Sequence, residues 1–223
     1  MNRNIVKGVL AGILLFLLCG TGLAAPGEDV SAVARAVDRH YNDLRSFQAE
    51  FTESYRGAGL ERTESGTLWL KRPGKMRWEY RQPKEKLFIS DGKNAWFYVP
   101  GERQARKTSV KKLEDLRSPL QYLLGHTKLE KEFAGLSFAP DVKPSQAGDV
   151  VLRGVPRNMQ GIQEVLLEIT PEHQIARITV EEVDGAVTEY AFSRQRENVQ
   201  VGDSEFRFSA PPGTEVIEGE MGQ

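Results

Sequence analysis

Apolar residues in the stretch 29–45 recur at intervals of three and four positions, which is the spacing of one face of an amphipathic helix. From Phe47 onward apolar and polar residues alternate, as they do in a half-buried β-strand. The pattern therefore predicts a helix over 29–45 that is followed directly by a strand. The apolar positions of this helix are Val30, Val33, Ala34, Val37, Tyr41 and Leu44.

Strand-like segments continue at short spacing through most of the remaining chain. The stretch 66–80, GTLWLKRPGKMRWEY, has two arms that meet at Pro73-Gly74, and Asp-Gly pairs at 91–92 and 184–185 mark two further hairpin turns. The last strand is expected within the segment EFRFSAPP.

The middle of the chain, 110–125, returns to helical spacing. Pro119 suits the first turn of a second short helix in this stretch, and Gly125 suits its end. A sheet of about ten consecutive strands has to curl or close. We therefore expect a mainly β fold with helices (α+β), namely an open or incomplete antiparallel β-barrel with helices at its mouth.

The hairpin at 66–80 would present large apolar side chains to one face of that sheet. By strand parity Leu68 and Leu70 share a face of the first arm, and Met76, Trp78 and Tyr80 share a face of the second. A barrel of this size fills its interior with side chains or leaves a cavity for a ligand. Periodicity alone fits both alternatives.

The first 25 residues have the layout of a cleavable secretory signal, with two basic residues, an apolar run shorter than a membrane span and a small-residue end at Ala25. Leu18 stands before Cys19, where a lipoprotein signal requires a small residue. We therefore expect cleavage of 1–25 and a mature chain, 26–223, that is one soluble, unlipidated periplasmic domain.

Candidate catalytic and metal-binding chemistry is sparse. Cys19 is the only cysteine, and His40, His126 and His173 are far apart without a paired ligand spacing. Acidic and basic residues nearly balance, 31 against 30, and are interspersed, which disfavours a nucleic-acid partner. We expect no enzymatic activity, no metal and no cofactor.

Four segments occur in an order that resembles the LolA family of periplasmic outer-membrane lipoprotein carriers. They are SFQAEFTE, GTLWLKRPGKMRWEY, QPKEKLFISDGKNAWFYVP and FRFSAPPGTEVI, and together they run through nearly all of the chain after the signal. The resemblance implies an open β-barrel with a lid of helices over an apolar cavity that takes acyl chains. The lid would fall on the helix 29–45 and on the two short helices at 110–125.

The resemblance also implies a role for the arginine of the Lys-Arg-Pro motif, which is Arg72. In the family this arginine bonds lid-helix carbonyls and holds the empty form closed. A buried guanidinium needs acceptors, and carbonyls at a helix end are available acceptors. An arginine that extends into water at the end of a strand fits the local pattern as well.

The other site residues follow from the same match and from periodicity. The acyl-chain cavity would be lined by Leu68, Leu70, Met76, Trp78 and Tyr80. Periodicity alone assigns the inner face of the lid, and for those residues packing without cargo contact fits equally. They are Val33, Val37, Leu120, Leu123 and Leu124.

The family function would make the protein a monomeric carrier of acylated lipoproteins. An ATP-driven inner-membrane transporter would load it, and an outer-membrane receptor would accept the cargo. A carrier of another amphiphile, such as a glycolipid, and a lipid-sensing envelope protein remain alternatives. One departure concerns Glu53, because family members commonly have glutamine at this position.

Overall fold

The computed structural model describes residues 29–111, 123 and 128–219. Helix α1 spans Val30–Asp43, as its apolar spacing predicts. Asp29 caps its N-terminus by accepting a hydrogen bond from the Ser31 backbone N–H at 3.1 Å, which satisfies one of the free donors of the first turn. The buried face of α1 consists of Val33, Ala34, Ala36, Val37 and Tyr41.

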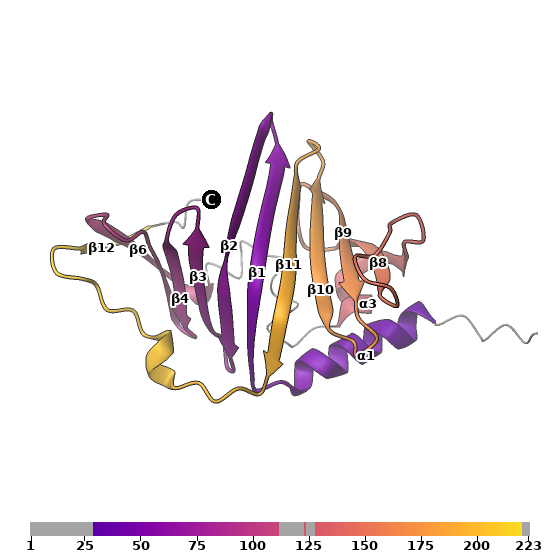
Figure 1. Cartoon of the computed structure of the whole chain (residues 1–223), viewed down its shortest axis with the longest axis horizontal. Helices are drawn as coiled ribbons and strands as arrows, with labels where there is room; N and C mark the ends of the chain where they lie inside the picture. Colours follow the sequence, from indigo (N-terminus) through magenta and orange to yellow (C-terminus); the bar gives the residue numbers. More distant parts are fainter. Residues whose placement is uncertain (1–28, 112–122, 124–127, 220–223) are drawn as a thin grey trace, which may run out of the picture.

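Twelve strands form one sheet in the order β12-β6-β5-β4-β3-β2-β1-β11-β10-β9-β8-β7 (Figure 1). Neighbouring strands are antiparallel except β12 and β6, which are parallel. Because β12 and β7 end the order without pairing to each other, the sheet is open. The strands are β1 (Ser46–Gly57), β2 (Leu60–Lys71), β3 (Lys75–Gln82), β4 (Lys86–Asp91), β5 (Asn94–Tyr98), β6 (Gln104–Ser109), β7 (Phe133–Phe138), β8 (Val150–Pro156), β9 (Ile162–Ile169), β10 (Ile175–Glu182), β11 (Val187–Glu197) and β12 (Glu215–Glu218).

The predicted fold class is therefore confirmed: the chain is mainly β, with an open and largely antiparallel sheet and few helices. The hairpin predicted at Pro73-Gly74 joins β2 to β3, and Lys71 pairs with Lys75 across it. The turns at 91–92 and 184–185 join β4 to β5 and β10 to β11. Local turn chemistry was thus sufficient to place these hairpins.

The strand predicted within EFRFSAPP is wrong. Residues Asp203–Phe206 form a short 3₁₀ helix, η2, and the final strand begins only at Glu215. The alternating phenylalanines of this segment are anchors: Phe206 is fully buried, and the Phe208 ring stacks on Trp96 at 6.2 Å between centroids. Long-range packing replaced the strand pairing that the alternation suggested.

The helices expected at 110–125 fall mostly outside the described residues. A further helix, α3 (Leu129–Glu132), was not predicted, because four residues are too few for a periodic signal. It lies beside α1, and the Asp38 carboxylate accepts a hydrogen bond from the Leu129 backbone N–H at 3.1 Å.

We call the face of the sheet that packs against α1 the inner face, and the opposite one the outer face. The segment 198–214, here called the C-terminal strap, leaves β11 and reaches β12 at the far edge of the sheet (Figure 1). Lys71 and Lys75 hold Asp203 of the strap with Nζ–O distances of 2.7 and 2.6 Å. Arg77 adds a hydrogen bond to the Glu205 carbonyl. These contacts fasten the strap to β2 and β3.

Replacing Asp203 by asparagine should lower the Tm near neutral pH. Hydrogen bonds from Lys71 and Lys75 lower the pKa of Asp203 from 3.8 to about 2. Because the folded pKa lies below the unfolded one, the stabilisation is present above the unfolded pKa and is lost as pH falls through the folded value. Thermal melts should show a Tm difference between wild type and Asp203→Asn that shrinks as the pH falls from 3.8 to about 2. Glu215→Gln, at an exposed residue of β12, is the control, and a constant difference at all pH values would contradict the assignment.

Candidate functional site

The hairpin β2–β3 contributes a continuous apolar wall to the inner face. Leu68 pairs with Trp78 and Leu70 pairs with Met76 across the two strands. Leu68, Leu70 and Trp78 are buried, and Met76 and Tyr80 are partly buried against the same core cluster. The structure therefore brings together all five residues that sequence analysis assigned to a cavity. Their contact with acyl chains stays a prediction.

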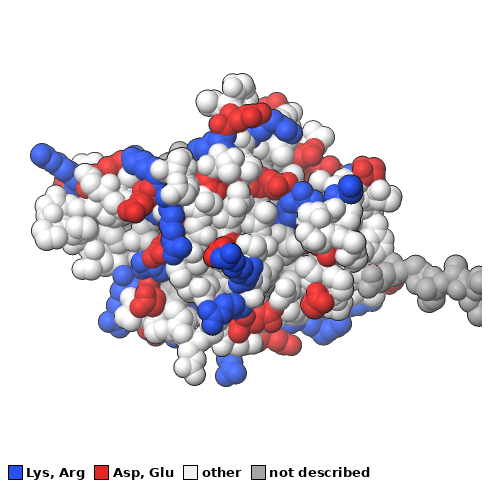
Figure 2. Space-filling model, in the orientation of Figure 1, with Lys and Arg blue, Asp and Glu red and all other residues white. Residues whose placement is uncertain are grey.

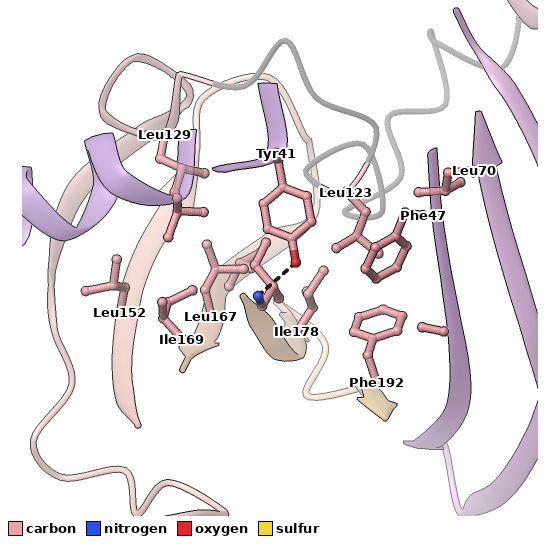
Figure 3. Packing of buried hydrophobic residues seen from close by; sticks show 14 of the residues in the cluster. Tyr41, Phe47, Leu70, Leu123, Leu129, Leu152, Leu167, Ile169, Ile178 and Phe192 are labelled. Atoms are coloured by element: carbon pink, nitrogen blue, oxygen red, sulfur yellow. Dashed lines mark hydrogen bonds between the residues drawn. The ribbon is translucent and has the colours of Figure 1, made fainter. Parts of the chain in front are cut away.

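Helix α1 lies over this inner face and closes the apolar cluster. Val33, Val37 and Tyr41 of α1 and the buried Leu123 belong to the same cluster as the wall. Figure 3 shows Leu123 and Tyr41 packed among side chains of the sheet that include Phe47, Leu70 and Phe192. Of the predicted lid residues, Leu120 and Leu124 lie outside the described residues.

A cavity of about 20 Å³ lies beside the C-terminal end of α1, between Tyr41, Phe47, Leu70, Arg72 and Leu123. That volume is on the order of one water molecule and is far too small for an acyl chain. An acyl chain can therefore reach the wall only if α1 or neighbouring side chains move.

Arg72 joins the hairpin to the end of α1. Its Nη1 donates to the Asn42 carbonyl at 2.6 Å, and its Nη2 donates to the Tyr41 carbonyl at 2.7 Å. The last carbonyls of a helix have no intrahelical partner, which makes them available to a guanidinium. The strand pattern alone fitted two positions for the Arg72 side chain, bonded to the helix end or extended into water. In the structure the side chain is half-buried and bonded to the helix end. Its role as a latch stays a prediction.

Tyr41 ties the same end of α1 to the other half of the sheet. Its hydroxyl accepts a hydrogen bond of 2.8 Å from the backbone N–H of Ile175 in β10, drawn as a dashed line in Figure 3. Burial raises the pKa of Tyr41 well above its ordinary value, so the hydroxyl is neutral at physiological pH. The helix end is therefore bonded to both halves of the sheet, by Arg72 on one side and Tyr41 on the other.

A row of charged side chains lies on the inner face at the end of the sheet remote from α1. Glu53 is separated from Phe47 by roughly 20 Å along β1. Both carboxylates of the row are nearly buried: Glu53 accepts a hydrogen bond from the Tyr80 hydroxyl at 2.9 Å, and Glu64 pairs with Lys86 at 2.6 Å. Arg62 lies within 3.7 Å of Glu53 and 3.4 Å of Glu64. We call Glu53, Arg62, Glu64, Tyr80 and Lys86 the polar row.

In the sequence, Glu53 stands out only as a departure from the family pattern. Strand parity from Phe47 through Phe51 already places Glu53 on the inner face, so the signal was present. Burial raises the pKa of Glu53, and the hydrogen bond from Tyr80 and the charge of Arg62 oppose this shift. No local pattern indicates the other members of the polar row, because they come from three other strands, β2, β3 and β4.

The outer face is hollowed over β10 and β11. The depression has a volume of about 510 Å³, and most of the residues around it are of polar or charged types, among them Asp149, Arg177 and Glu189. In Figure 2 basic and acidic side chains are intermingled over the visible face.

Within the part of the chain that the structure describes, no group of three or more His, Cys, Asp and Glu residues is arranged to hold a metal ion. None of the described helices combines the length and the apolar character needed to cross a bilayer.

Comparison with known proteins points to one family. The family profile of the outer membrane lipoprotein carrier protein LolA matches residues 42–209. An outer-membrane lipoprotein carrier protein of Alkalilimnicola ehrlichii is 30% identical over 98% of this chain and 99% of its own length. One from Chromobacterium violaceum is 29% identical over 89% of this chain and 93% of its own. Among solved structures, the Mycobacterium tuberculosis lipoprotein LppX shares the fold, with a TM-score of 0.51, 12% identity and coverage of 78% of this chain and 97% of that one.

Tyr41→Phe should destabilise the protein by about 1–3 kcal/mol, because it leaves the buried Ile175 N–H without an acceptor. Denaturant unfolding would measure the loss. Tyr55→Phe, on the less buried end of β1, is the control. Equal stability of Tyr41→Phe and the parent protein would show that the Tyr41 hydroxyl does not hold the helix end.

Glu53→Gln should stabilise the protein near neutral pH. The folded pKa of Glu53 is raised above its ordinary 4.5, so ionisation is less favourable in the folded state and stability falls as pH rises from the unfolded pKa through the folded one. Glutamine removes this penalty and keeps an acceptor for Tyr80. The gain, followed by thermal melts across pH, should vanish below about pH 4. A gain that persists in acid would indicate a packing effect instead.

Proposed function

The chain belongs to the LolA family of outer-membrane lipoprotein carriers, and from this premise we propose that it binds lipoprotein acyl chains between α1 and the inner face of the sheet. The observation that carries the proposal is the pair of hydrogen bonds from Arg72, which directly follows the β2 side of the apolar wall, to the end of α1. A cover held by a few polar bonds can be displaced, whereas an ordinary hydrophobic core has no such fastening.

The energies involved fit a reversible cover. Each charge-assisted hydrogen bond contributes roughly 1.5–3 kcal/mol. An acyl chain of about 15 methylenes gains on the order of 12 kcal/mol when it leaves water, at ~0.8 kcal/mol per methylene. The entry of a chain can therefore offset the loss of both Arg72 bonds. Once the chain has left, the bonds favour return to the packed state.

Loading cannot rest on affinity alone. Three chains correspond to roughly 36 kcal/mol of apolar transfer, which exceeds the ~18–21 kcal/mol limit of non-covalent association. Extraction from a bilayer must therefore be driven from outside, and an ATP-driven inner-membrane transporter would supply that work. An outer-membrane receptor would then accept the cargo. The carrier itself, a periplasmic monomer formed by 26–223 after removal of 1–25, performs no chemistry.

The proposal is tested by incubating the mature protein with energised spheroplasts and measuring newly made lipoproteins in the soluble fraction. Wild-type protein should release lipoprotein. Arg72→Leu should load but hand its cargo on at least tenfold more slowly, because the bonds that favour the empty state are gone. Arg194→Leu, an exposed arginine paired with Glu50 on the sheet, should behave as wild type.

The outcomes separate the alternatives. No release by wild type, in spheroplasts that respond to a LolA of the same species, would reject lipoproteins as cargo. Mass spectrometry of lipids bound to the purified protein would then identify a glycolipid or another amphiphile. Equal handover by Arg72→Leu and wild type would reject the latch and leave the carrier role intact.

A further inference from the structure

Trp78 has a buried donor without an acceptor. Its side chain is 3% exposed, and among the described residues nothing accepts a hydrogen bond from its Nε1–H. The indole N–H can only donate. The ring lies 4.6 Å from Phe51 and 6.4 Å from Tyr190 between centroids, so its surroundings on the inner face are mostly aromatic carbon. Buried donors in proteins are normally paired, and an exception calls for an explanation.

Packing alone does not require a tryptophan at this position. A phenylalanine would offer an aromatic ring to Phe51 and Tyr190 without the uncompensated polar group. The unpaired N–H makes the packed state less stable than it would otherwise be. The same donor would become favourable if an acceptor entered the apolar interior.

The proposed function brings one kind of acceptor into this interior. An acyl chain is hydrocarbon except for the ester or amide carbonyl at its head. Resting on that function, we propose that the Nε1–H of Trp78 donates a hydrogen bond to an acyl carbonyl of the cargo. Trp78 would thereby fix how far the chain enters.

The position of Trp78 also assigns the orientation of the cargo. Leu70 and Met76 lie on the side of Trp78 that leads toward Arg72 and the end of α1, and Tyr80, which bonds Glu53 of the polar row, lies on the other side. The inner face is therefore apolar toward the helix and polar beyond Trp78. The hydrocarbon would lie toward α1 and the polar head toward Glu53.

The polar row favours an uncharged head. Lys86 is paired with Glu64, and Arg62 lies between the two carboxylates, so two bases balance two acids. An anionic phosphate would have to compete with carboxylates that already hold these bases. A glyceryl ester or an amide, which needs only hydrogen bonds, fits the balanced row better.

The test compares two synthetic lipopeptides that differ in one feature. One has acyl chains joined to glycerol by esters, and the other has alkyl chains of equal length joined by ethers, which lack the carbonyl. Wild-type protein should bind the ester roughly three- to tenfold more tightly than the ether, the contribution of one neutral hydrogen bond. Trp78→Phe should lose this preference and bind the ether as well as wild type does. Trp96→Phe, on the outer face against Phe208, is the matched control.

An independent readout comes from the indole N–H signal of Trp78 in two-dimensional ¹⁵N NMR, assigned by its absence in Trp78→Phe. The signal should move downfield with the ester lipopeptide and less with the ether. If wild type binds both lipopeptides equally and the signal does not discriminate, the hydrogen bond is refuted and the carrier role stands. If Trp78→Phe weakens both equally, Trp78 acts by packing alone, which also refutes it. If wild type binds neither, the proposed function fails and this inference falls with it.

Discussion

An open sheet with an apolar inner face has to be covered, and this requirement organises the molecule. Leu68, Leu70 and Trp78 of β2 and β3 are buried in the same apolar cluster as the inward side chains of α1, so the inner face is kept from water. Helix α1 contributes its own buried face to this cover, and that face centres on Val33, Val37 and Tyr41. Because α1 runs directly into β1, it reaches the inner face without a long connection. The packed interior and the bonds at the helix end follow from this placement.

The two faces of the sheet are covered in different ways. On the outer face, the strap runs between β11 and β12, which both belong to the sheet, and Phe206 and Asp203 anchor its middle. On the inner face, the end of α1 is fastened by the carbonyl bonds of Arg72 and by the Tyr41 hydroxyl. The strap is thus built into the sheet at both ends, whereas α1 enters the sheet at one end only and is otherwise held by its apolar face and a few side-chain bonds. In a carrier, the second arrangement suits the face that must open.

Polarity along the inner face gives the site a direction. Leucines lie nearest the helix, aromatic rings follow, and the balanced charges of Glu53, Glu64, Arg62 and Lys86 come last. An amphiphile has the same order of polarity. The unpaired N–H of Trp78 lies where the apolar part meets the polar part. Under the proposed function, this gradient would give an amphiphilic cargo one orientation on the inner face.

The sequence by itself determined features that depend on near neighbours. Periodicity identified α1 and most of the strands, turn residues identified three hairpins, and parity placed Leu68, Leu70 and Trp78 on one face. The tertiary structure alone decided which groups meet across long separations. It paired Arg72 with the carbonyls of Tyr41 and Asn42, turned the segment around Phe206 into a 3₁₀ helix, and added β12 parallel to β6. Local spacing specifies backbone conformation and side-chain direction, but the partner of a buried polar group and the filling of an interior depend on distant residues.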